Sequence, residues 1–114
     1  VPAQFGARLM VLGAPIPAGA DPKLAGALRD MTVRVVDGTG KDLDSGKGSA
    51  ILEHPLNAVI WLADDLRKAG VVLEPGDLLS LGSFSRLMPP QPGTAVRAVH
   101  EGLPGNPAVS VRFR

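Results

Sequence analysis

The chain has 114 residues, 45% of them hydrophobic, and a formal net charge of +1. This length provides one domain rather than two, and the aliphatic composition with little net charge argues against disorder. The balanced charge excludes a basic nucleic-acid-binding stripe, and no apolar run reaches the roughly 20 residues that cross a bilayer. The absence of cysteine excludes disulfides and thiolate metal sites, and it agrees with a cytoplasmic protein.

The first half of the chain predicts short strands separated by loops. Residues 7–12 are apolar and indicate a buried strand, and the Gly- and Pro-rich residues 13–25 indicate a loop with a helical turn near Leu24. Residues 31–36 are rich in β-branched side chains and end at an Asp-Gly-Thr-Gly sequence, which is typical of a hairpin turn. We therefore expect residues 41–45 to return as the partner strand.

One long amphipathic helix is predicted in the middle of the chain. Pro55 suits its first position, where the missing N–H costs nothing, and Gly70 is a natural end. Between these two residues, apolar side chains recur at helical spacing, namely Leu56, Val59, Ile60, Ala63 and Leu66. Charged side chains occupy the opposite face, namely Asp64, Asp65, Arg67 and Lys68.

The rest of the chain predicts a turn and three short strands. Residues 74–77 read Glu-Pro-Gly-Asp, which has the chemistry of a type II turn. Strands are expected at residues 78–81, 94–100 and 108–114, the last with a clean alternation of apolar and polar side chains. About six strands and one principal helix, without βαβ repeats, predict an α+β, β-rich fold with a mixed, mainly antiparallel sheet. Residues 1–114 would form a single domain or part of one.

The sequence shows no internally complete catalytic or metal site. The Gly-rich residues 38–49 fail the phosphate-loop pattern, because a glycine separates the Gly-Lys pair from the serine, and we interpret these glycines as turns and points of close backbone approach. His54 and His100 have no partner at metal-ligand spacing, and the acidic residues form no cluster that suits a divalent metal. Ser83 lacks the Gly-x-Ser-x-Gly sequence of a nucleophile elbow.

Two residues each keep two interpretations. His54 is either a general base or, as we favour, a residue at the start of the helix whose ring hydrogen-bonds the backbone. Arg86 lies in apolar surroundings after a strand end and a glycine. It either clamps a carboxylate with two hydrogen bonds or lies across apolar neighbours at the surface, and the sequence favours neither.

Three stretches carry motifs that occur together, in this order, in one family. Residues 45–63 contain a Gly-rich turn, a His-Pro-x-Asn motif and a Trp-Leu-Ala helix, and residues 73–86 contain a Gly-Asp turn, an apolar strand and a Gly-Ser-Phe loop. Residues 108–113 are similar to a closing strand, and residues 9–13 fit an earlier one. Together they resemble the C-terminal half of the 2-keto-4-pentenoate and 2-oxohept-ene-dioate hydratases, of the fumarylacetoacetate hydrolase superfamily.

The resemblance implies a β-rich roll that works with Mg²⁺ or Mn²⁺. The implied reaction is the addition of water to a 2-hydroxydienoate or 2-keto-enoate in aromatic catabolism, in which the metal chelates the 2-keto acid and stabilises enolate charge. A similar branch decarboxylates 4-oxalocrotonate and remains an alternative. The carboxylate metal ligands of the family lie upstream of the matched region, so we expect this chain to hold no metal and to be inactive alone.

The resemblance also implies a substrate pocket. We expect Gly82, Ser83 and Arg86 to line it, with Arg86 as the candidate partner of a distal carboxylate. His54 is expected to lie near or support the pocket, and Arg34 to contribute charge. The rival hypothesis is a non-catalytic domain that keeps the scaffold for binding or assembly. Unpaired strand edges predict either a homo-oligomer or a complementing chain in both cases.

Overall fold

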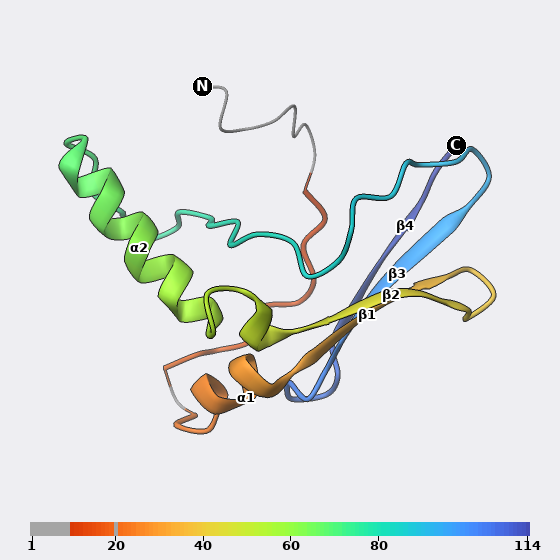
Figure 1. Ribbon diagram of the computed structural model, residues 1–114, viewed down its shortest axis with the longest axis horizontal. Coiled ribbons are helices and arrows are strands. Elements are labelled where there is room, and N and C mark those ends of the chain that lie inside the picture. Colours follow the sequence, from red (N-terminus) through yellow and green to blue (C-terminus); the bar gives the residue numbers. More distant parts are fainter. Residues whose placement is uncertain (1–9, 20) are drawn as a thin grey trace.

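The computed structural model describes residues 10–19 and 21–114, and its body is one four-stranded antiparallel sheet (Figure 1). The strand order is β2-β1-β3-β4, so that β1 and β3 are the inner strands. Their bounds are Thr32–Asp37 for β1, Asp42–Lys47 for β2, Ala95–Glu101 for β3 and Ala108–Arg112 for β4.

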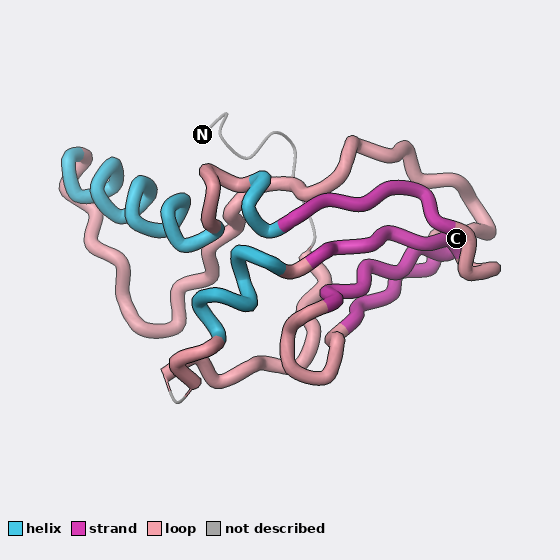
Figure 2. The backbone as a smooth tube through the Cα atoms, turned by 60° about the horizontal axis from the view of Figure 1, so that its bottom comes forward, coloured by secondary structure: helices cyan, strands magenta, loops and turns pink. Residues whose placement is uncertain are grey.

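The helices gather at one end of this sheet (Figure 2). Helix α1 (Leu24–Asp30) leads into β1, and the short 3-10 helix η2 (Gly48–Ala50) follows β2. Strands β1 and β2 form a hairpin, so the start of β1 and the end of β2 lie side by side, and α1 and η2 meet there. The Gly48 N–H donates to the Met31 carbonyl at 2.9 Å at this junction. Helix α2 (Pro55–Lys68) extends away from the sheet (Figure 1).

The α+β class is confirmed. The predicted strands that pair with a neighbouring strand are present. The strands expected at residues 31–36, 41–45, 94–100 and 108–114 all form, as does the helix that starts at Pro55, and the turn near Leu24 is a full helix, α1. The three named strand pairs of the described residues are antiparallel, so a mixed sheet is not found there. The closed roll stays a prediction.

Two predicted strands are wrong, and the reason is the same for both. Residues 78–81 and 10–12 are apolar, but neither segment pairs with a strand of the sheet. A strand is stabilised by hydrogen bonds to a neighbour, and an apolar run by itself does not supply them. Residues 7–9 of the predicted strand 7–12 lie outside the described residues.

A β-bulge in the hairpin places two aspartates of β2 on opposite faces of the sheet. Val35 pairs with Asp44, but Val36 pairs with Asp42, so Leu43 is an extra residue in β2. Side chains alternate between the faces along an unbroken strand, and one extra residue reverses that alternation. Asp44 therefore shares a face with Val35, whereas Asp42 lies on the opposite face.

The buried core of the described residues is small. It consists of six hydrophobic residues, none of them completely excluded from water, namely Leu24, Met31, Val33, Val35, Val36 and Ile51. The chain exposes 8720 Å², whereas a compact monomer of 11.8 kDa exposes about 5900 Å². Much apolar surface, including the α2 side chains Ile60 and Trp61, is therefore uncovered.

Substituting Gly48 with alanine should destabilise the junction of α1 and η2. A Cβ at Gly48 would overlap the carbonyl oxygen of Leu28, which is backbone and has little room to move. We expect the free energy of unfolding in urea to fall by about 1–3 kcal/mol. Gly26→Ala is the matched control, because its Cβ meets no atom within 4 Å, and alanine in a helix should stabilise by about 0.5–1 kcal/mol. Equal stability of the two variants would contradict the close approach.

Candidate functional site

A pocket of about 340 Å³ lies between the sheet and the segment that leads into β3. Strand register explains its floor, because Val35 pairs with Ala98 and Ala98 pairs with Val109, which places these side chains on one face. The wall is formed by Ser83 and residues 85–89. The floor is apolar and comes from β1, β3, β4 and the residue beyond β4: Val35, Val96, Ala98, Val109, Val111 and Phe113.

Two contacts hold the wall of this pocket on β2. The backbone N–H of Arg86 donates to Oδ2 of Asp44 at 2.8 Å. Gly46 lies directly against the backbone of Phe84, and any Cβ at this position would overlap the Phe84 carbonyl oxygen. Gly82 begins the wall segment with a φ of +119°, in the region that favours glycine. Close backbone approach, predicted for the Gly-rich stretch, is thus confirmed at Gly46.

Asp44 positions the wall of the pocket, and the sequence analysis missed it. Its carboxylate accepts the N–H of Arg86 and also that of Ser45, at 2.9 Å for the second. These hydrogen bonds, together with the nearby Arg86 charge, lower the pKa of Asp44 below its ordinary value. No local motif marks this aspartate, because its role depends on the bulge in β2 and on a segment 42 residues away.

The pocket brings together Ser83 and Arg86, whereas Gly82, directly before Ser83, is not among the residues that line it. A guanidinium offers two parallel hydrogen bonds to a carboxylate, and serine hydroxyls hydrogen-bond an oxygen beside it. An apolar floor accepts a short carbon chain. The arrangement therefore suits a small carboxylic acid. Among the residues that line the pocket there is no carboxylate or imidazole to exchange a proton with it.

Arg34 lies outside this pocket, on the opposite face of the sheet. Its Nη1 donates to Oε1 of Glu101 and its Nη2 donates to Oδ1 of Asp42, both at 2.6 Å. These hydrogen bonds and charges raise the pKa of the Arg34 guanidinium. Arg34 thus links β1 to both neighbouring strands, and its part in substrate binding stays a prediction.

His54 caps the start of α2. Its Nδ1 accepts the N–H of Leu56 at 3.1 Å, and its Nε2 lies 2.7 Å from the carbonyl oxygen of Ala25. Because a carbonyl only accepts, the neutral ring with its hydrogen on Nε2 satisfies both contacts. This geometry agrees with the interpretation of His54 as a helix-start residue, and both of its nitrogens are engaged.

The chain is similar in sequence to several bacterial hydratases. No family model matches the chain. The 2-hydroxyhexa-2,4-dienoate hydratase of Comamonas testosteroni is 38% identical over 64 residues, which cover 56% of this chain and 24% of that protein. The 2-oxo-hept-4-ene-1,7-dioate hydratase of Escherichia coli is 40% identical over 50 residues, which cover 44% and 19%. Other relatives, 36% and 34% identical, are named 2-keto-4-pentenoate hydratase.

Solved structures agree with these relatives. The chain superposes on 4-oxalocrotonate decarboxylase from Pseudomonas putida G7 with a TM-score of 0.69 and 31% identity, over 77% of this chain and 32% of that one. Over the matched part, the chain is related in sequence and in fold to the 2-keto-4-pentenoate hydratases and to 4-oxalocrotonate decarboxylase. It spans about a third or less of the length of the relatives that it matches.

The metals of the solved relatives raise the question of which side chains could serve as ligands in the described residues. The decarboxylase structures are complexed with calcium or magnesium. Such ions need several converging oxygen ligands, and residues 10–19 and 21–114 contain no group of three His, Asp or Glu side chains that could provide them. In the same residues, no helix has the length and apolar character needed to cross a membrane.

Acid should release the pocket wall of this hydratase relative. The lowered pKa of Asp44 means that its contact with Arg86 is complete above the ordinary value of about 3.9 and is lost as pH falls through the lowered value. We expect the Arg86 amide proton to titrate in NMR spectra with a midpoint below about 3.9. The titration should vanish in Asp44→Asn. A midpoint at or above the ordinary value in the parent would contradict the contact.

Removing the His54 ring should cost stability. We expect His54→Ala to lower the free energy of unfolding by about 0.5–2 kcal/mol, because α2 loses its cap and its tie to Ala25. His54→Asn should recover part of this loss, since asparagine also caps helices. Unchanged stability in thermal and urea unfolding of His54→Ala would favour the general-base interpretation instead.

Proposed function

We propose that this chain forms part of the substrate pocket of a hydratase that adds water to a 2-hydroxydienoate or 2-keto-enoate in aromatic catabolism. The observation that supports this most directly is the sheet pocket, where Arg86 and Ser83 lie beside an apolar floor. The relatives named hydratase support the reaction class. In this proposal Arg86 binds a carboxylate, the floor seats the carbon chain, and Ser83 orients an oxygen of the substrate.

A dicarboxylate is the substrate class that we favour. One relative is named for a 1,7-dioate, and one decarboxylase structure is complexed with adipate, which carries a carboxylate at each end. Arg86 provides a cation for one of these groups. The other end of the substrate, with its 2-keto group, would meet Mg²⁺ or Mn²⁺ held by residues outside the described part of this chain. A homo-oligomer or a complementing chain could provide them.

Decarboxylation of a 4-oxalocrotonate-type substrate is the second candidate. It is favoured by the share of this chain that superposes on the solved decarboxylase, 77% at 31% identity. By sequence, the 4-oxalocrotonate decarboxylase of a Pseudomonas species is 30% identical over 69% of the chain. Release of carbon dioxide separates this reaction from hydration, which retains every carbon atom of the substrate.

The function is tested on the chain joined to the metal-binding part of a relative, with Mg²⁺ and with dicarboxylate and monocarboxylate dienoates as substrates. We expect loss of dienoate absorbance, and Arg86→Ala should raise KM for the dicarboxylate about 10- to 100-fold by removing a charged hydrogen bond. The monocarboxylate should be little affected. Arg97→Ala is the control, because its neighbours Val96 and Ala98 line the pocket and Arg97 itself points to the other face. Absence of turnover with every substrate would reject the proposal.

A further inference from the structure

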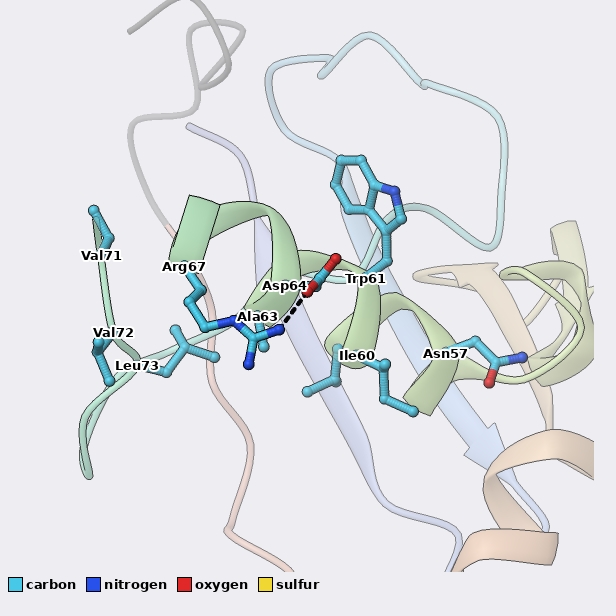
Figure 3. Close-up of a pocket in the computed structure, with 10 residues that line it drawn as sticks. Asn57, Ile60, Trp61, Ala63, Asp64, Arg67, Val71, Val72 and Leu73 are labelled. Atoms are coloured by element: carbon cyan, nitrogen blue, oxygen red, sulfur yellow. Dashed lines mark hydrogen bonds and ion pairs between the residues drawn. The ribbon is translucent and has the colours of Figure 1, made fainter. Parts of the chain in front are cut away.

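A hollow of about 760 Å³ lies along α2, but its polar side chains already have partners. Figure 3 shows Arg67 paired with Asp64, at 2.6 Å. The Asn57 amide, at the other end of the hollow, donates to the Leu52 carbonyl at 2.7 Å. A small-molecule site needs a few polar groups that fix the orientation of the ligand. This hollow therefore offers little that would recognise one.

A smaller hollow, of about 280 Å³, contains a histidine that the proposed function does not use. We call it the His100 hollow. Its roof is the segment before α1, which lies close over β4, since a Cβ at Gly13 would come to 3.0 Å from the Val109 side chain. His100 is the one polar side chain of the lining, which consists of residues 11–14, Ile16, His100, Leu103 and residues 107–109.

Two contacts with the same carbonyl oxygen fix the His100 ring. The backbone N–H of His100 donates to the Pro107 carbonyl at 2.8 Å, and ring Nδ1 lies 3.3 Å from that oxygen. The turn between them is held by Asn106, whose side chain accepts the N–H of Gly102 at 3.0 Å. Because a carbonyl only accepts, Nδ1 carries the hydrogen of the neutral ring, and Nε2 keeps a lone pair that can accept a hydrogen bond.

The Nε2 atom of His100 is available to a ligand. It has no hydrogen-bond partner among residues 10–19 and 21–114. Over the same residues, no buried side-chain nitrogen or oxygen atom lacks a partner, so Nε2 is not buried. An accessible acceptor in apolar surroundings is the kind of group that orients a small ligand.

The His100 hollow adjoins the sheet pocket. Val109 lines both of them. His100 and Ala98, a residue of the pocket floor, are two residues apart on β3, so they point to the same face about 7 Å from each other along the strand. The Arg86 backbone is held on β2, and β1 lies between β2 and β3. One face of the sheet thus carries a cation, an apolar floor and a neutral acceptor.

We propose that the His100 hollow is a second compartment of the substrate site. In it, Nε2 of His100 accepts a hydrogen bond from the 2-hydroxyl group of a dienoate whose distal carboxylate binds Arg86. The identity of this ligand rests on the proposed function. The hydroxyl of the 2-hydroxy form donates to Nε2, whereas the 2-keto oxygen only accepts and finds no donor on Nε2 of the neutral ring. His100 therefore determines specificity, in favour of the 2-hydroxydienoate over its 2-keto tautomer.

Three stable acids test this proposal by NMR titration of the 114-residue chain. The first is 6-hydroxyhexanoate, in which a hydroxyl group replaces one end of adipate, and the others are its methyl ether and hexanoate. The ¹⁵N resonance of the Arg86 Nε reports the carboxylate, and that of His100 Nε2 reports the hydroxyl. We expect all three acids to shift the first resonance and only the hydroxy acid to shift the second. The hydroxy acid should bind about 2- to 10-fold more tightly than the ether, which cannot donate.

Two variants of His100 form a matched pair. Both lose the ring contact with Pro107, so a general loss of stability does not distinguish them. His100→Leu removes the acceptor and should abolish the preference for the hydroxy acid over its ether, while the response of Arg86 remains. His100→Gln should restore part of this preference, because its amide oxygen is again an acceptor.

The outcomes separate this proposal from the proposed function. A response of Arg86 to every acid, with none at Nε2 or with equal affinity for the hydroxy acid and its ether, would overturn the role of His100 and leave acid binding by Arg86 intact. Absence of any response at Arg86 would reject both. An Nε2 response to the hydroxy acid that is unchanged in Arg86→Ala would show two separate sites, and it would overturn the second compartment.

Discussion

The structure depends on β1, one of the two strands that are paired on both sides. Its alternating side chains serve two faces: Val33 and Val35 enter the core on one face, and Arg34 bridges both neighbouring strands on the other. The bulge opposite Val35 and Val36 determines on which face of the sheet Asp42 and Asp44 of β2 lie. Without the extra residue in β2, Asp42 and Asp44 would share one face, because side chains two residues apart along a regular strand point the same way. One acid would then lose its partner, either Arg34 or the backbone N–H of Arg86.

The same hairpin explains why glycine recurs in this part of the chain. Gly46 and Gly48 each lie where another backbone comes closer than a side chain permits, Phe84 in the first case and Leu28 in the second. The first contact places the pocket wall on β2, and the second closes α1 over η2 at the end of the sheet. The Gly-rich residues 38–49, which resemble a phosphate loop in composition, thus serve the packing of backbone against backbone. These glycines leave room for backbone to meet backbone, and Gly46 in this way accommodates the segment that carries Ser83 and Arg86.

Sequence reasoning predicted the elements that local chemistry determines and missed what depends on distant partners. The helix at Pro55, the hairpin and the strands that follow were recognisable from turn residues and periodicity. Residues 78–81 have the composition of a strand, but pairing requires a neighbour that composition does not reveal. Ser83 and Arg86 line one pocket, and their contact with substrate is still a prediction. Asp44 was not foreseeable, because its alternation is reversed by the bulge and its hydrogen-bond partner lies far along the sequence.

Two features of the described residues are incomplete by themselves. The sheet pocket has a cation and hydroxyls to bind an acid, but its lining holds no group for proton transfer. Helix α2 is held in place by contacts of His54 and Asn57, but its apolar side chains Ile60 and Trp61 are exposed to water. An isolated monomer gains nothing from either feature, since exposed apolar area costs free energy and binding alone changes no bond.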